Sequence, residues 1–251
     1  MIIKGSRELK GRYHELFAGD VFIGTIVSRH LKRSMLIDLL ERGVICLPSP
    51  LSQDLNSSKV SQALVFKSLM LPHTCAVTRR TDLIDAVNLY NEQGIGPVVS
   101  KENHLHCGHG VRWWDTIETL YSFMALSDAS YPFVVQPFLE NFTDVRVIVV
   151  GDYVEAYQRY NPNNFRMNIS SGGKIYPFSL DEDKERFCRK AMARGRFPFA
   201  HIDLHITDDG NCYLSEIALN GGIKGAKISR TENDQKKEDR LEHLAKHVQQ
   251  G

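Results

Sequence analysis

The chain has 251 residues, of which 42% are hydrophobic and 24% charged, a balance typical of a folded protein with a sizeable core. Its 31 basic and 30 acidic residues give a net charge of +1 without a basic stripe, so we expect no nucleic-acid partner. No apolar run has the length of a membrane span, and the N-terminus lacks the apolar stretch of a signal peptide. Five widely spaced cysteines without a CxxC pair suit a reducing compartment. We therefore expect a cytoplasmic protein that does not associate with membranes.

The first 57 residues are interpreted as one short α/β unit. The pattern of apolar residues predicts a strand over 21–27, a helix over 28–43 and a second strand over 44–48. The polar run SPLSQDLNSS that follows indicates a first domain boundary.

Helices and strands alternate in the middle block. Thr81 and Gly94 mark the start and stop of one helix, and Asp115 with Glu118 forms a capping-box pattern at the start of another. The predicted elements are a helix from residue 58 to 71, a strand over 74–78, a helix over 81–94, a strand over 96–101 and a helix over 115–128.

Longer strands dominate after residue 131. They are predicted over 133–140, 144–160 and 174–178, followed by a helix over 181–195 and a hairpin over 201–220. The tail over 231–251 is highly charged, so we expect a solvated helix or a partly disordered end without chemistry.

The hairpin places two carboxylates together. An Asp-Gly pair lies between two apolar runs, which is the strongest short-range hairpin signal. If Asp209 and Gly210 form a two-residue loop, pairing outward from it puts Asp203 opposite Glu216 on one face of the sheet. A register slipped by one residue would instead leave one carboxylate exposed at an edge.

Two directly opposed carboxylates destabilise a sheet unless a cation compensates them. Oxygen ligands suit Mg²⁺ or Mn²⁺, so Asp203 and Glu216 are predicted metal ligands. Ala218 and Asn220 are the next positions on that face, and the stretch NGGIKGAK beyond them can approach an anionic ligand closely.

The stretch KENHLHCGHG (101–110) has two interpretations. Zinc could be held by its three histidines and one cysteine, His104, His106, Cys107 and His109. Zinc sites usually draw ligands from separated pairs, however, and these four lie within six residues. In the other interpretation the stretch is a phosphate-binding lid, with a lysine at a strand end and glycines behind it.

Taken in order, several stretches resemble the ATP-grasp superfamily, in particular its RimK-like branch of carboxylate–amine ligases. The resemblance covers residues 58 to 226. The stretches are SK at 58–59, PVVSK ending in Lys101, the glycines Gly108 and Gly110, VVQPFLE at 134–140, TDVRVIVVGDYVEAYQR with Asp144 and Arg146, NFRMNISSGG at 164–173, and Asp203 and Glu216 followed by NGG.

The resemblance implies an α/β (α+β) ATP-grasp fold, in which two α+β subdomains grip ATP, preceded by a short α/β N-terminal unit. We place the N-terminal unit at 1–57, the first subdomain at 58–133, the second subdomain with the metal site at 134–230 and the tail at 231–251.

The activity implied by the resemblance is an ATP-dependent ligase that activates a carboxylate as an acyl phosphate and joins it to an amine. The implied cofactors are ATP and Mg²⁺ (or Mn²⁺). The implied partners are a small-molecule or peptide carboxylate and an amine, and the branch often self-associates, which is compatible with a homo-oligomer.

The resemblance also assigns nucleotide contacts. Lys59 and Lys101 would hold the α- and β-phosphates, and Gly108 and Gly110 would let backbone N–H groups approach them. Contacts to the adenine edge and beyond are assigned to the linker and the strand after it: Gln136, Pro137, Phe138, Leu139 and Asp144.

The remaining roles concern phosphoryl transfer and the acid substrate. Arg166 would clamp the γ-phosphate or the acyl phosphate through its planar fork, Asn168 would assist through its amide, and Arg146 would hold the substrate carboxylate. The metal is assigned to Asp203, Glu216 and Asn220.

The sequence departs from the family at one metal position. A metal-binding Asn commonly follows the Glu by two residues, and here that position is Ala218. Either Asn220 or His201, which is opposite Ala218 in the predicted register, could compensate.

Plainer interpretations stay open at several positions. Lys101 could be a solvated strand end, and Arg146, alternating with valines, could lie on an exposed sheet face. Arg166 and Asn168 could belong to a polar loop. At the level of the whole protein, Ala218 and the short N-terminal unit favour a rival function, a regulatory ATP-binding protein of the same fold.

Overall fold

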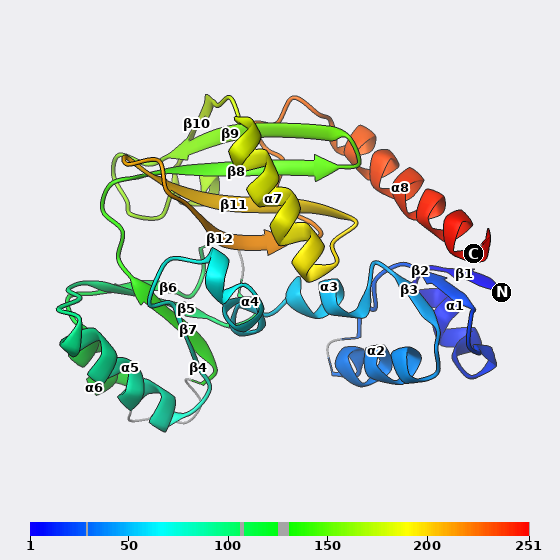
Figure 1. Ribbon diagram of the computed structural model, residues 1–251, viewed down its shortest axis with the longest axis horizontal. Coiled ribbons are helices and arrows are strands. Elements are labelled where there is room, and N and C mark those ends of the chain that lie inside the picture. Colours follow the sequence, from blue (N-terminus) through cyan, green and yellow to red (C-terminus); the bar gives the residue numbers. More distant parts are fainter. Residues whose placement is uncertain (29, 106–107, 125–130, 251) are drawn as a thin grey trace.

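The computed structural model describes residues 1–28, 30–105, 108–124 and 131–250. Its strands form three sheets of three, four and five strands (Figure 1). In Figure 1 the five-stranded sheet lies above the four-stranded sheet, and the three-stranded sheet lies beside them near both ends of the chain. No helix in these ranges is long and apolar enough to cross a membrane.

The N-terminal unit is a parallel sheet with its own small core. The expected strand over 21–27 ends earlier because Gly24 adopts a φ of +144°, which β geometry does not accommodate. The first strand and helix of this unit were not expected. Its elements are β1 (Ile2–Lys4), α1 (Gly5–Arg12), a 3₁₀ turn (Tyr13–Glu15), β2 (Val21–Ile23), α2 (Lys32–Glu41) and β3 (Ile45–Leu47).

The polar run at the expected boundary contains a helix, α3 (Pro50–Leu55). The Ser49 hydroxyl accepts a hydrogen bond from the Ser52 N–H, and Pro50 occupies the first helical position, where its missing N–H costs nothing. Leu55 is fully buried, so this segment packs into the main core.

The four-stranded sheet has the order β4-β7-β5-β6, and α5 and α6 share a hydrophobic core with it. The predicted cap at Asp115 is wrong by one residue, because the Thr116 hydroxyl accepts from the Thr119 N–H. The elements are α4 (Lys59–Val65), a 3₁₀ turn (Lys67–Leu69), β4 (Cys75–Val77), α5 (Arg80–Glu92), β5 (Val98–Glu102), β6 (Val111–Trp114), α6 (Ile117–Met124) and β7 (Phe133–Pro137).

The five-stranded sheet is antiparallel with the order β10-β9-β8-β11-β12. Helix α7 crosses one face of it (Figure 1) and contributes buried Cys188, Ala191 and Met192 to the main core. The elements are β8 (Phe142–Val150), β9 (Tyr153–Tyr160), a 3₁₀ turn (Ile169–Ser171), β10 (Lys174–Pro177), α7 (Glu182–Gly195), β11 (Phe199–Thr207) and β12 (Cys212–Ala218).

The β11–β12 hairpin has the predicted pairing of Asp203 with Glu216, but its loop and its strand alignment differ from those expected. Its loop has three residues, because the Thr207 N–H donates to the Asn211 carbonyl and Gly210 adopts a φ of +85°. That loop alone would slip the register by one residue, but a β-bulge after Asp203 restores it. Asp203 therefore does pair with Glu216, although the expected two-residue loop is wrong.

The charged tail is an ordered helix, α8 (Arg230–Gln250), and only part of it is solvated. Leu241 and Ala245 are buried in the main core, and Lys237 is only 6% exposed. The expectation of a solvated or disordered end is therefore wrong for one face of this helix. The helix lies between the five-stranded sheet and the N-terminal unit (Figure 1), with contacts to β8, β2 and β3.

Because α8 is packed, truncating its buried face should destabilise the protein. We expect Leu241→Ala to lower the free energy of unfolding by about 2–3 kcal/mol, since it removes a buried side chain and leaves a cavity. Val248→Ala is the matched control, because Val248 is 40% exposed on the same helix. Urea unfolding measures both, and equal stabilities for the two variants would contradict the packing described.

Candidate active site

A cavity of ≈ 620 Å³ lies between the four-stranded and five-stranded sheets. This volume is within the usual range for small-molecule sites. One wall comes from β5, β6 and β7, and the other from β8, β9, β11 and β12. Most of the predicted site residues line it: Lys59, Lys101, Gly108, Gln136, Phe138, Leu139, Asp144, Arg146, Arg166, Asn168, Asp203, Glu216 and Asn220. Two do not, Pro137 and Gly110.

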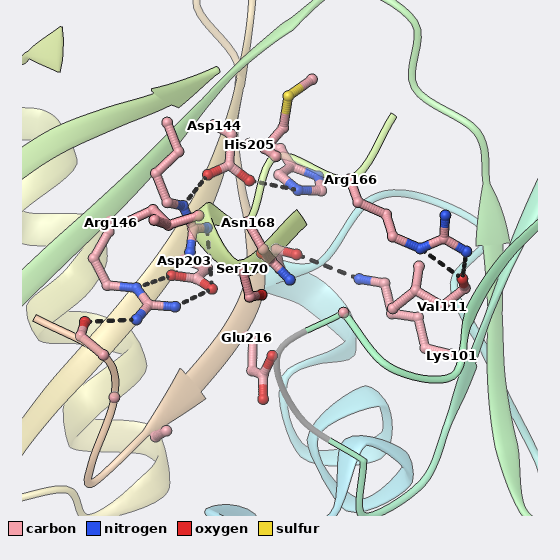
Figure 2. A pocket seen from close by; sticks show the side chains of 18 of the residues that line it. Lys101, Val111, Asp144, Arg146, Arg166, Asn168, Ser170, Asp203, His205 and Glu216 are labelled. Carbon is pink, nitrogen blue, oxygen red and sulfur yellow. Dashed lines mark hydrogen bonds and ion pairs between the residues drawn. The ribbon is translucent and has the colours of Figure 1, made fainter. Parts of the chain in front are cut away.

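Buried charges alternate across the cavity face of the five-stranded sheet. Asp203 pairs in register with Arg146, whose Nε and Nη2 donate to the two carboxylate oxygens at 2.5 and 2.8 Å (Figure 2). Asp144 pairs in register with Arg159, whose Nε lies 2.6 Å from Oδ1 of Asp144. The Nη2 atom of Arg159 also lies 3.1 Å from Oδ2 of Asp203. Arg146 thus lies on the cavity side, and the alternative of an exposed sheet face does not hold.

Burial and charge act against each other in this network. Burial alone would raise the pKa of Asp203, but the nearby Arg146 and Arg159 outweigh it and hold that pKa well below its usual range. For Asp144 burial dominates and raises the pKa. His205, 3.7 Å from Asp144, has its pKa lowered to about 3 by burial and by Lys101, so it is neutral at physiological pH.

The two predicted phosphate lysines converge on β12 from the other wall. Lys59 lies 3.7 Å from the Glu216 carboxylate and also donates to the Leu105 carbonyl. Lys101 donates to Ser215 at 3.3 Å (Figure 2). Ser215 is the extra residue of the β-bulge, which turns its hydroxyl toward the lysine. Burial lowers the pKa of Lys101 to about 8, although Glu216 opposes this, so Lys101 is not a solvated strand end.

Gly108, in the stretch predicted to be a lid, and Val111 after it contact the opposite subdomain. Gly108 has a φ of +77°, and a Cβ there would lie 2.6 Å from the amide nitrogen of Asn168. Arg166 donates to the Val111 carbonyl (Figure 2) and lies over the Phe165 ring, 4.3 Å from its centroid. Arg166 and Asn168 therefore meet the lid, and the interpretation as a purely solvated polar loop does not hold.

The linker to the five-stranded sheet is shorter than expected. Val134 to Pro137 belong to β7, and the chain crosses between the sheets after them. The Phe138 N–H donates to the Pro97 carbonyl, so this donor cannot pair with an adenine edge as the arrangement stands. Phe138 also packs edge-to-face with Trp113 and Phe165, forming an aromatic cluster at the cavity wall.

Asp203 and Glu216 carry carboxylate oxygens of the kind that a divalent cation binds, although both oxygens of Asp203 accept hydrogen bonds from Arg146. They face one another across β11 and β12 in the cavity, but within the described ranges no three His, Cys, Asp or Glu side chains form a complete metal site. Further ligands would have to be phosphate or water oxygens. The predicted ligand Asn220 accepts from Lys237 through its side-chain oxygen at 3.0 Å, so that oxygen is already engaged.

The zinc interpretation finds no support in the described residues. His104 interacts with the Ser57 carbonyl and with Asn103, and His109 lines the cavity. His106 and Cys107 lie outside the described residues.

Sequence reasoning missed three charged or titratable residues at or beside the cavity, namely Arg159, His205 and Lys237. Arg159 could have been found, because pairing outward from the two-residue turn at Gly151 places it opposite Asp144. Lys237 had no such signal, since a lysine in a charged tail is normally solvated.

The comparisons agree with this geometry. Residues 55–239 match the family model described as the RimK-like ATP-grasp domain. The chain belongs to the RimK-like ATP-grasp family. The predicted resemblance and fold are thereby confirmed.

Curated relatives of this family member are ligases. The α-aminoadipate–LysW ligase LysX of Saccharolobus solfataricus is 27% identical over 79% of the chain and 74% of its own length. The coenzyme gamma-F420-2:alpha-L-glutamate ligase of Methanococcus maripaludis is 25% identical over 70% of the chain and 64% of its own length.

Solved structures show the same ATP-grasp fold. The D-alanine–D-alanine ligase of Bacillus anthracis, complexed with ATP, has a TM-score of 0.63 and 15% identity, covering 98% of this chain and 84% of its own. The ATP-grasp ligase PsnB, complexed with Mg and ADP, has a TM-score of 0.55 and 18% identity over 84% of this chain and 67% of its own. Membership of this family agrees with the predicted class of ATP-dependent carboxylate–amine ligases, and the PsnB structure of the same fold holds Mg and ADP.

The Lys59–Glu216 pair should couple nucleotide to metal. Glu216→Gln frees Lys59 for phosphate, so ADP should bind roughly 2–5-fold tighter in EDTA, the range expected for one ion pair. The same change removes a metal ligand, so the gain in ADP affinity on adding Mg²⁺ should disappear. Isothermal titration with and without Mg²⁺ measures both effects.

Glu102→Gln is the matched control for that titration, because Glu102 pairs with Arg112 and does not line the cavity. Unchanged Mg²⁺ enhancement in Glu216→Gln would contradict the coupling.

Lys101 should make nucleotide binding sensitive to pH. Its folded-state pKa of about 8 is below the usual lysine value, so its charge is lost as pH rises through 8. ADP affinity in EDTA should therefore fall between about pH 7.5 and 9.5, by roughly tenfold if one charged hydrogen bond is lost. Lys101→Arg stays charged over this range and should give a flat profile. A flat profile in the wild type would argue against Lys101 as a phosphate ligand.

Proposed function

We propose that the protein activates a carboxylate substrate with ATP and transfers the acyl group to an amine in the cavity between the two sheets. The observation that carries the proposal is the meeting of opposite charges there. Asp203 and Glu216 on one wall face Lys59 and Lys101 from the other subdomain. This is the combination that a metal-bound polyphosphate requires.

The first step is attack of a substrate carboxylate oxygen on the γ-phosphorus of ATP. The bond to the β,γ-bridging oxygen breaks, and ADP leaves with that electron pair. Lys59 and Lys101 neutralise phosphate charge, and Arg166 can reach the transferred group if it releases the Val111 carbonyl. Mg²⁺, held by Asp203 and Glu216, would supply further neutralisation of phosphate charge when bound.

The second step is attack of an amine on the acyl carbon. The carbon–oxygen bond to phosphate breaks, the amine loses a proton, and an amide and inorganic phosphate result. The lid, which includes Gly108 and His109, would exclude water from the acyl phosphate during this step.

The proposal extends to the class of the substrates. A small-molecule or peptide carboxylate and an amine are proposed, and the relatives' names direct the first assays to L-glutamate and L-α-aminoadipate. We also propose a cytoplasmic location and self-association of the protein. The proposed domain limits are 57/58, 133/134 and 230/231.

A regulatory ATP-binding protein is the second candidate. Ala218 supplies no oxygen ligand, and both oxygens of Asp203 are already engaged by Arg146. A protein that binds nucleotide without turnover could retain such a site.

Thermal unfolding with ATP, with and without Mg²⁺, tests both candidates, followed by ADP release against amino acids, dicarboxylates and amines. The proposed ligase should show Mg²⁺-dependent stabilisation and amine-dependent ADP release. Stabilisation without turnover on any substrate would favour the regulator. No nucleotide-dependent shift at all would reject both.

The lid interpretation has its own test. Lys101→Ala should weaken ADP binding far more than His104→Asn, because Lys101 faces the phosphate region and Asn tolerates the φ of +63° at position 104. Fluorescent-nucleotide titration compares the two variants. The reverse order, together with zinc found by elemental analysis, would restore the metal interpretation of the histidine stretch.

A further inference from the structure

A buried lysine of the last helix reaches the end of the active-site strands. The Lys237 ammonium lies 2.9 Å from the Leu219 carbonyl oxygen, 3.0 Å from the Asn220 side-chain oxygen and 3.2 Å from Nε2 of His201. An ammonium group has three N–H donors and no acceptor. Each of its three neighbours must therefore accept, which makes Nε2 of His201 an acceptor and puts the ring proton on Nδ1.

The Nδ1 atom of His201 is a donor without a partner. His201 is 3% exposed, it lines the cavity, and its buried Nδ1 has no hydrogen-bond partner among the described residues. A buried N–H left unpaired costs free energy, so such a group is usually completed by a ligand, an ion or water.

A cationic group lies next to His201. A Cβ on Gly221 would be 2.9 Å from Nη1 of Arg146 and 3.0 Å from Cγ of His201, so both side chains lie close to the same side of Gly221. Arg146 donates to Asp203 and Gly222 and has five N–H groups in all, more than these contacts use. N–H donors and positive charge together select an anionic oxygen as the ligand.

The position along β11 indicates which anion this is. His205 lies at the linker end of the strand, with its ring 4.3 Å from that of Phe142. Asp203 comes next, opposite Glu216, and His201 lies beyond it on the same face. His201 is therefore on the far side of the predicted metal carboxylates from the linker, where the acid to be activated would have to lie.

We propose that Lys237 is a positioning residue that holds His201 as an Nδ1–H donor, and that His201 and Arg146 together form a subsite for an anionic oxygen of the acid substrate. The identity of that anion as the acid substrate rests on the proposed function. The subsite and the role of Lys237 rest on the contacts alone.

Nitrogen NMR on the ¹⁵N-histidine-labelled full chain tests the positioning role. The two ring nitrogens of His201, assigned by their loss in His201→Asn, should show a proton on Nδ1 in the wild type. Lys237→Met should increase the Nε2–H form, whereas Lys246→Met, an exposed lysine of the same helix, should leave the spectrum unchanged. A wild-type His201 in the Nε2–H form would overturn the proposal without any variant.

Acetate, the simplest carboxylate, tests the subsite in the presence of ADP and Mg²⁺. It should shift the Nδ1 signal of His201 and the amide signal of Gly221. His201→Leu should weaken acetate binding about tenfold, as monitored at Gly221, while His201→Asn, which keeps an N–H near the Nδ1 position, should stay within about threefold. No acetate-dependent shift at either residue in the wild type would overturn the subsite.

These readouts separate the inference from the proposed function because neither needs turnover. If acetate shifts the Nδ1 signal of His201 but nucleotide does not stabilise the protein, the subsite is supported and the ligase proposal fails. If nucleotide and Mg²⁺ bind but acetate shifts neither the Nδ1 signal of His201 nor the amide signal of Gly221, only the subsite proposal fails.

Discussion

The strand register of the five-stranded sheet is the constraint on which the site depends. It sets Arg159 beside Asp144 and Arg146 beside Asp203, so each buried charge has an opposite charge on the neighbouring strand. In a low-dielectric interior, removing one member of such a pair leaves an uncompensated charge and typically costs about 3–5 kcal/mol. A shift of one residue in β8 would break both pairs, whereas a shift in β9 or β11 would break the contacts of Arg159 or of Asp203. The chemistry of the cavity and the integrity of the sheet therefore depend on the same alignment.

One face of this sheet contributes mainly to stability, and the other carries the charged groups that line the cavity. One face is apolar and packs against α7, which provides the burial that stabilises the subdomain. The other face carries ionised groups whose burial is unfavourable and which are tolerated because they neutralise one another. The favourable free energy of burying the apolar face offsets the unfavourable free energy of burying charged groups on the other face.

The sequence predicted the pairing of Asp203 with Glu216 because the hairpin signal is local, and it predicted the fold through the ordered stretches that resemble the ATP-grasp family. The sequence could not reveal that the register shift caused by the longer loop is cancelled by a bulge, since bulges depend on packing against other strands. It gave no sign that Lys237 is buried, because composition assigns a charged segment to solvent. The departure at Ala218 was visible, but the engagement of Asn220 by Lys237 required the folded helix. Most of what remained hidden was long-range contact, together with local details such as the three-residue loop after Thr207 and the helix cap at Thr116.

The bulge at Ser215 has a consequence for how this hairpin can vary. It separates the tip of the hairpin, where the loop sets the alignment, from the base, where Asp203 and Glu216 must stay opposed. Changes in loop length can be absorbed at the bulge before they reach the carboxylates. The exposed tip at Asp208 and Asp209 is therefore a place where the chain can accept inserted sequence while the active end of the hairpin keeps its alignment.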